Sequence, residues 1–138
     1  MKPDAIDQPY VVAEVTREFH AYERALMAND VDALIAFFWP DARLTRYGIA
    51  DRQLGIDQMI AFRRATLAPS FTRRLENLRI SAFGDDTAVA YVEFVRSDSP
   101  LRGFQSQTWA RLSLASAPPR WYVVAAHVSM IEFAHGGP

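Results

Sequence analysis

The stretch TRYGIADRQLGIDQMIAFRR, residues 45–64, says most about how this chain folds. It predicts the end of a strand, a turn at Gly48, a short extended segment and then a helix. Side chains alternate between two faces of a strand, so Leu44 and Arg46 share one face. If Leu44 lies in the core, Arg46 points there too, and a buried guanidinium needs a carboxylate partner or an anionic ligand. The structural alternative is a core carboxylate such as Glu93, or a side chain turned to the surface.

Two helices are predicted before this strand and a third after its turn. The first covers residues 9–27, where apolar side chains recur every three or four positions. Asp30 is expected to cap a second helix over residues 31–38, and Asp57 a third over residues 58–67. The apolar stripe of the first helix consists of Val11, Val15, Phe19, Tyr22 and Leu26.

After Pro69 the apolar pattern changes to a period of two, which indicates strands joined by short turns. Helices first and an antiparallel meander afterwards are typical of an α+β domain with a curved sheet wrapped on helices. We expect one domain over residues 1–138, with a loose N-terminal arm at residues 1–8 and a frayed tail at residues 134–138. The predicted meander strands span residues 71–83, 87–96, 104–115 and 121–133.

The composition argues against several classes of function. A formal net charge of −1 gives no reason to expect binding to nucleic acid or to an acidic membrane surface. Without cysteine there is no disulfide and no thiolate chemistry. No metal-ligand spacing or glycine-rich phosphate loop is present, so we expect neither a metal nor an organic cofactor. The absence of an apolar signal core and of a membrane-length apolar run favours a cytoplasmic protein.

Polar side chains occupy the last two predicted strands where core residues would be expected. The small residue Ala125 would leave space beside them, although a simply solvated face is the alternative. Alternation groups Gln105, Gln107, Trp109 and Arg111 on one face of the third strand, and Val123, Ala125, His127 and Ser129 on one face of the fourth.

Tyr22 is the only residue of the first helix's apolar stripe that has a polar tip. Its hydroxyl needs a hydrogen-bond partner if it is buried, and an ordinary core tyrosine with its hydroxyl at the rim is the alternative. Arginines, a tyrosine, amides and one histidine together favour binding of a small planar carboxylate, because arginine matches a carboxylate with two parallel hydrogen bonds.

Four segments and the order of the elements resemble known proteins. The segments are VAEV at 12–15 with YERAL at 22–26, TRYG at 45–48 with AFR at 61–63, QSQTW at 105–109, and VAAHVS at 124–129. The order of elements is similar to that of the NTF2-like superfamily, which includes SnoaL-like and ketosteroid-isomerase-like proteins. The segments resemble the AtzH/HpxZ-like family, small bacterial proteins encoded beside amidases. The resemblance covers residues 10–132 and implies a cone with a pocket between the bent sheet and the helices.

The resemblance also implies a reaction. The cyanuric-acid type of this family suggests a decarboxylating amidohydrolase that converts 1,3-dicarboxyurea to allophanate. The alternative is a non-catalytic binding or amidase-accessory protein of the oxalurate type. In ketosteroid-isomerase-like sequences an oxyanion-hole tyrosine precedes the Asp that opens the second helix by eight residues, and Tyr22 and Asp30 match that spacing. Arg46 stands where those enzymes place an aspartate base, which favours an anionic substrate over proton abstraction.

Under this hypothesis each candidate residue has an expected role. Arg46, with Arg63 or Arg74, would grip a substrate carboxylate, and Tyr22 would protonate the carbamate nitrogen. His127 would shuttle the proton, since histidine titrates near neutral pH. By analogy with the superfamily we expect a homodimer, and by gene context an amidase partner. Gln105, Gln107 and Ser129 would hold the flat urea amides, and Trp109 is a further substrate-binding candidate.

Overall fold

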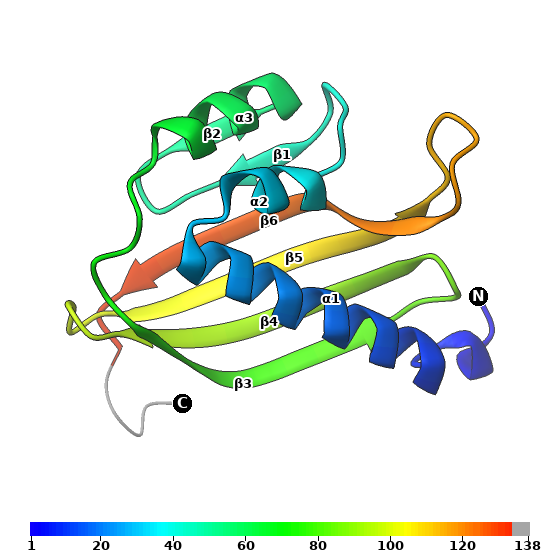
Figure 1. The fold of residues 1–138 in the computed structure, drawn as a ribbon. Helices are drawn as coiled ribbons and strands as arrows, with labels where there is room; N and C mark the ends of the chain where they lie inside the picture. Colours follow the sequence, from blue (N-terminus) through cyan, green and yellow to red (C-terminus); the bar gives the residue numbers. More distant parts are fainter. Residues whose placement is uncertain (134–138) are drawn as a thin grey trace.

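Three α-helices lie on one face of a six-stranded curved sheet (Figure 1), in a computed structural model that describes residues 1–133. This arrangement confirms the predicted α+β class. The helices are α1 (Pro9–Ala28), α2 (Val31–Phe37) and α3 (Ile56–Ala65). The strands are β1 (Thr45–Tyr47), β2 (Arg52–Leu54), β3 (Arg73–Ala82), β4 (Thr87–Arg96), β5 (Arg102–Leu112) and β6 (Arg120–Ile131).

The helix boundaries follow local chemistry. Asp30 caps α2 as predicted, because its Oδ1 accepts a hydrogen bond from the Ala33 amide at 3.3 Å. The prediction that Asp57 caps α3 was wrong. The helix begins at Ile56, two residues earlier than predicted, after Gly55, whose φ of +88° is a conformation that favours glycine. Asp57 therefore lies in the first turn of α3, where its charge favours the positive end of the helix dipole.

Strands β3 to β6 form the predicted antiparallel meander, and β1 and β2 extend it in the order β2-β1-β6-β5-β4-β3. Strand β1 pairs with β6 in parallel, which places Arg46 opposite Ala126. Two bulges interrupt the ladder, one in β3 between Glu76 and Arg79 and one in β6 opposite Thr108 and Trp109. Bulges bend a strand and increase its twist, so they help the sheet to curve around the helices.

The concave face of the sheet carries the apolar core and faces the helices. Helix α1 packs on β3 and β4, and α2 packs on β6. The largest fully buried side chains include Trp109, Phe19, Phe38, Phe94 and Leu34. On the opposite face, called the outer face below, no helix of residues 1–133 lies (Figure 1).

The expectation of a loose N-terminal arm was wrong. Pro3–Ala5 form a 3-10 turn, and Ile6 makes a β-bridge with Phe83. Asp7 exchanges two hydrogen bonds of 2.8 Å with the backbone of Ala82, which attaches the arm to the end of β3. The predicted frayed tail at residues 134–138 lies outside the described residues.

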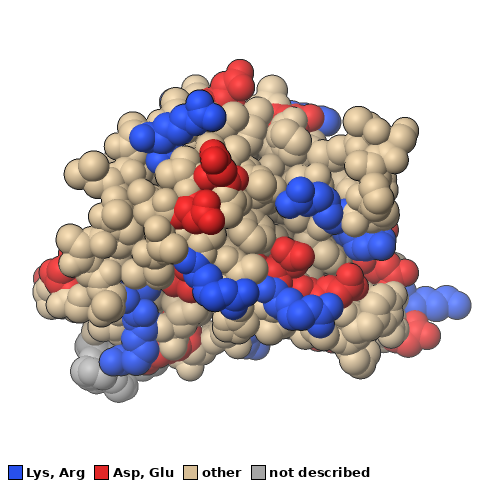
Figure 2. Space-filling view, viewed as in Figure 1, with Lys and Arg blue, Asp and Glu red and all other residues tan. Residues whose placement is uncertain are grey.

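Charged side chains of both signs are interspersed on the helix-bearing face (Figure 2). The face shown has no large area of a single sign, in keeping with the near-zero net charge. Among residues 1–133, no helix is long and apolar enough to cross a membrane.

Candidate functional site

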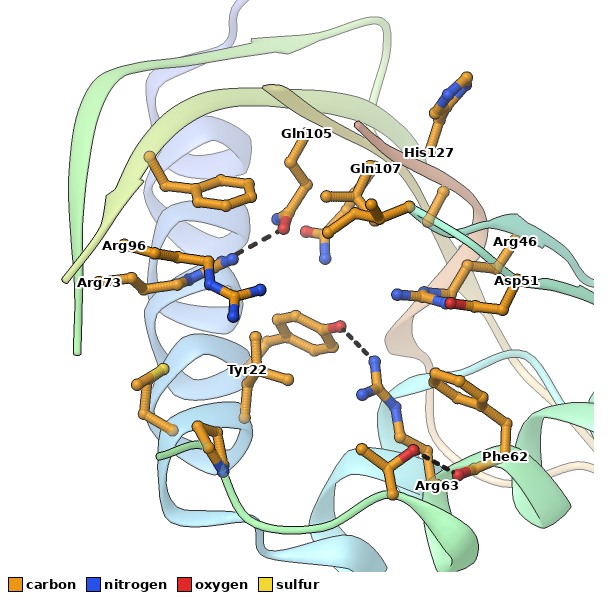
Figure 3. Close-up of a pocket in the computed structure, with 18 of the residues that line it drawn as sticks. Tyr22, Arg46, Asp51, Phe62, Arg63, Arg73, Arg96, Gln105, Gln107 and His127 are labelled. Atoms are coloured by element: carbon orange, nitrogen blue, oxygen red, sulfur yellow. Dashed lines mark hydrogen bonds and ion pairs between the residues drawn. The ribbon is translucent and has the colours of Figure 1, made fainter. Parts of the chain in front are cut away.

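A cavity of about 260 Å³ lies between the concave face of the sheet, α1 and α3 (Figure 3). Its lining includes six of the residues predicted from the sequence, of which His127 on β6 is treated below and the other five come from four different elements. These are Tyr22 from α1, Arg46 from β1, Arg63 from α3, and Gln105 and Gln107 from β5. Tyr22 and Arg46 therefore face one pocket, as expected.

Arg63 is the most unusual group in the pocket. Its side chain lies one turn after the fully buried Met59, and the residue is only 5% exposed. Arg63 Nη2 donates a hydrogen bond of 3.1 Å to the hydroxyl oxygen of Tyr22, which is 4% exposed. No described carboxylate forms an ion pair with Arg63, and its buried Nε has no hydrogen-bond partner within residues 1–133. A buried cation without a counter-charge is costly, so this site favours an anionic ligand.

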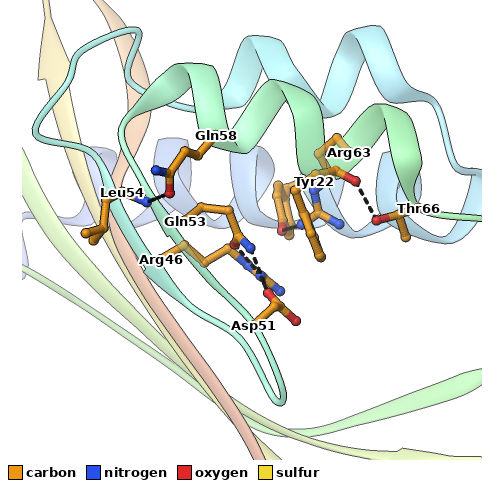
Figure 4. A network of polar contacts seen from close by, with 9 residues as sticks. Tyr22, Arg46, Asp51, Gln53, Leu54, Gln58, Arg63 and Thr66 are labelled. Carbon is orange, nitrogen blue, oxygen red and sulfur yellow. Dashed lines mark hydrogen bonds and ion pairs between the residues drawn. The ribbon is translucent and has the colours of Figure 1, made fainter.

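Arg46 is held in a polar network (Figure 4). Its Nη1 donates to Asp51 Oδ1 and to Gln53 Oε1, both at 2.8 Å, and Gln53 Nε2 donates to the same Asp51 oxygen at 2.9 Å. A Cβ at Gly48 would lie 2.2 Å from Asp51 Oδ1, so the turn predicted at Gly48 leaves room for the carboxylate. Glu93, the partner considered from the sequence, lies on the outer face with Arg102. Arg46 is therefore an oriented and charge-balanced arginine.

Arg46→Lys should lower ligand affinity or turnover more than tenfold, about 1.4 kcal/mol. Lysine keeps the charge but loses the planar fork that reaches Asp51, Gln53 and a ligand together. The check is a comparison of kcat/KM, or of affinity for a dicarboxylate, between the two proteins. Unchanged values would show that Arg46 only holds the β1–β2 turn in place.

Two further arginines line the pocket and were missed from the sequence. Arg73 makes a bidentate ion pair with Glu23, with both contacts at 2.6 Å, and also donates to Gln105 Oε1 at 3.2 Å. Arg96 lies 3.6 Å from the Phe71 ring centroid and pairs with Asp98. A signal existed for Arg96, because it continues the inward alternation of Val92 and Phe94. Each of these arginines has a carboxylate partner, which Arg63 lacks within the described chain.

The structure contradicts the expected role of Arg74. Arg73 pairs with Arg96 across the sheet and points inward, so its neighbour Arg74 points to the outer face. There the Arg74 side chain is 72% exposed and contacts Glu76. Hydrogen bonds from Arg74 and then from Arg102 hold the pKa of Glu76 below its usual value.

The structure also contradicts the expected roles of His127 and Ser129. Val123 pairs with Trp109 and points inward, but the bulge at Val124 shifts the alternation by one residue, so Ala126 faces the pocket instead. Although His127 borders the cavity, its ring points away from it (Figure 3) and packs edge-on against Tyr47. His127 and Ser129 both border a second hollow of about 330 Å³ on the outer face.

Trp109 shares the inward face of β5 with the two glutamines but is fully buried and does not line the cavity. Its indole Nε1 donates to Gln107 Oε1 at 3.2 Å. Trp109 therefore positions a pocket residue and is not itself placed to contact a ligand.

The lining is rich in hydrogen-bond donors. Four arginines border it, and among the described lining residues Asp51 carries the only carboxylate. No group of three or more described His, Asp or Glu side chains has an arrangement that could hold a metal ion. The lining therefore best matches a small ligand with several oxygen acceptors.

Comparison with known proteins places the chain in a family. The AtzH-like family matches residues 4–134. A structure of a protein of unknown function from Pectobacterium atrosepticum is 41% identical, with a TM-score of 0.88 over 96% of this chain and 99% of that one. A cystatin-like fold protein from Burkholderia xenovorans is 42% identical, with a TM-score of 0.87 over 94% and 98%. A search of curated proteins gave no match.

More distant structures share the fold alone. An NTF2-like protein of unknown function from Pseudomonas putida is 16% identical, with a TM-score of 0.70 over 87% of this chain and 86% of that one. A ketosteroid isomerase-like protein from Erwinia carotovora atroseptica is 15% identical, with a TM-score of 0.66 over 88% and 97%. The chain has the α+β cone of the NTF2-like superfamily and belongs to the AtzH-like family.

Proposed function

We propose that this protein is a cofactor-independent enzyme that decarboxylates an N-carboxylated urea, converting 1,3-dicarboxyurea to allophanate in the catabolism of cyanuric acid. The observation that carries the proposal is the buried Arg63, which has no carboxylate partner in the described chain and lies beside the Tyr22 hydroxyl. The cavity of about 260 Å³ suits a small metabolite, since it falls below the range typical of drug-sized ligands. The membership of the AtzH-like family agrees with this reaction class.

In the proposed reaction, the bond between the carbamate nitrogen and its carboxyl carbon breaks. The electron pair stays on nitrogen, the carboxyl group leaves as CO2, and the nitrogen gains one proton. Tyr22 is the proposed proton donor, because its oxygen already accepts a hydrogen bond from Arg63 and its own hydrogen is free for the ligand. Arg63 would then stabilise the tyrosinate through a charge-assisted hydrogen bond until solvent returns the proton.

Arg63 and Arg46 have different proposed roles in holding the substrate. Arg63 would contact one carboxylate of the substrate, because it has no other anion to contact in the described structure. Arg46 would orient the substrate from β1 while Asp51 keeps its fork in place. His127 has no part in this mechanism, since its ring lies on the other face of the sheet.

The test is to add freshly prepared 1,3-dicarboxyurea to the purified protein and to follow allophanate and CO2 against the rate in buffer alone. An enzyme should accelerate the conversion in proportion to protein concentration and complete many turnovers. A non-catalytic accessory protein should bind the compound, and at most slow its spontaneous breakdown, with a stoichiometry of about one per site. That second result would overturn the enzymatic proposal.

An accessory role would have a surface available for it. No helix of the described chain covers the outer face, and Tyr47, Tyr91 and Ile131 on it are about half-exposed. An amidase partner or a second copy of the chain would find its apolar contacts there. The pocket lies on the concave face, so binding on the outer face is compatible with either function.

A further inference from the structure

Two glutamines, Gln105 and Gln107, reach from β5 into the pocket (Figure 3). The amide oxygen of each is already occupied. Arg73 Nη2 donates to Gln105 Oε1 at 3.2 Å, and Trp109 Nε1 donates to Gln107 Oε1 at 3.2 Å. Guanidinium and indole groups only donate hydrogen bonds, so each must face an amide oxygen and not an amide nitrogen.

This chemistry fixes which end of each amide is left for a ligand. With the oxygens occupied, both glutamines have their NH2 groups available, and an NH2 group can only donate. Gln105 Nε2 is buried and has no hydrogen-bond partner among residues 1–133. Gln107 is 2% exposed, and its amide nitrogen donates to no described residue. A buried donor without a partner, such as Gln105 Nε2, is costly, and a ligand that supplies an acceptor would remove that cost.

The two partners are themselves held firmly. Arg73 is clamped by Glu23 through two contacts of 2.6 Å and lies 4.4 Å from the Phe94 ring centroid. Trp109 is fully buried and packs edge-on against Phe37. Because Arg73 and Trp109 are held in place, neither glutamine amide can flip, and the NH2 groups of both glutamines are preorganised for a ligand.

We propose that Gln105 and Gln107 are specificity-determining residues that bind oxygen acceptors at the sheet side of the ligand, opposite Arg63 and Tyr22. The pocket thereby selects small flat molecules with acceptor atoms at both ends, such as dicarboxylates, over molecules with one carboxylate. This role differs from the one expected from the sequence, in which the glutamines hold the urea amides. Ligand N–H groups would face Asp51, the described carboxylate of the lining. The proposal rests on the proposed function only in taking this cavity as the ligand site.

Calorimetric titration with glutarate and butyrate tests the proposal. Glutarate has two carboxylates separated by the same number of atoms as in 1,3-dicarboxyurea, and butyrate keeps one of them. The parent protein should bind glutarate at least tenfold more tightly than butyrate. Gln105→Met and Gln107→Met should each reduce this ratio severalfold by weakening glutarate alone, because butyrate can still use Arg63. Arg63→Met should weaken both ligands.

Ser106→Ala is the matched control, since Ser106 lies between the glutamines on the outer face and should leave both affinities unchanged. If Gln107→Met fails to fold because Trp109 loses its acceptor, Gln105→Met decides the matter. No glutarate binding by the parent protein, or an unchanged ratio in folded glutamine variants, would overturn the proposal. If the glutarate preference is found as expected but the parent protein does not turn over dicarboxyurea, only the enzymatic proposal fails.

Discussion

An Arg63→Met variant should lose about 30-fold to 5,000-fold in affinity for a carboxylate ligand, because removing one partner of a buried charge pair costs about 2–5 kcal/mol. The unliganded protein should keep its stability to within about 1–2 kcal/mol. The variant loses one hydrogen bond to Tyr22 but also the cost of burying an unpaired cation. Titration with glutarate and denaturant unfolding without ligand measure the two effects.

Arg64→Met is the control for this change. Arg64 follows Arg63 on α3 but is exposed, so its loss removes the same formal charge without touching the pocket. It should leave affinity within about twofold, since exposed charges are screened by solvent and salt. Strong destabilisation of Arg63→Met together with unchanged binding would show that Arg63 is a structural residue.

The expected separation between binding and stability has a physical basis. Arg46, Arg73 and Arg96 are all paired with carboxylates, so each is charge-balanced before any ligand arrives. Arg63 has no carboxylate partner within the described chain, so the folded protein bears the free-energy cost of a buried, unpaired cation. Proteins keep destabilising features, such as an unpaired buried charge, mainly at functional sites. Arg63 is therefore a stronger candidate than Arg46 for the residue that binds the ligand carboxylate.

Several parts of the site follow from the sequence because they depend only on local periodicity. Leu44 is buried and Arg46 lines the pocket, as strand alternation predicts. The same rule places Gln105 and Gln107 on one face of β5. Helical spacing puts Tyr22 in the buried stripe of α1, and it also places Arg63 four residues after the buried Met59.

Other parts depend on features that alternation cannot reveal. One extra residue at Val124 moves His127 to the outer face, and nothing in the local composition of β6 predicts where that bulge falls. The choice between Arg73 and Arg74 required the exact register of β3 against β4. The partner of Arg46 depended on the turn at Gly48, which brings Asp51 back beside β1. Long-range pairing and turn geometry therefore set the limit of what the sequence could predict.

A Tyr22→Phe variant should keep its fold and lose about a hundredfold or more in turnover of dicarboxyurea. The ring stays in the apolar stripe and keeps its edge-on contacts with Phe37 and Phe38. Only the hydroxyl is removed, which should cost about 1 kcal/mol of stability for the hydrogen bond from Arg63. Because Arg63 remains, the affinity for glutarate should fall much less than kcat. Single-turnover kinetics and a binding titration separate the two quantities.

Two further variants distinguish chemistry from packing at Tyr22. Tyr22→Ala should also open a cavity in the core and cost about 3–5 kcal/mol of stability, by analogy with Phe→Ala. Tyr91→Phe removes an exposed hydroxyl from the outer face and should change neither turnover nor stability. If Tyr22→Phe converts dicarboxyurea at the parent rate, Tyr22 is not the proton donor. Because the His127 ring lies on the outer face, the proton would then have to come from a water molecule placed by Arg63 and Asp51.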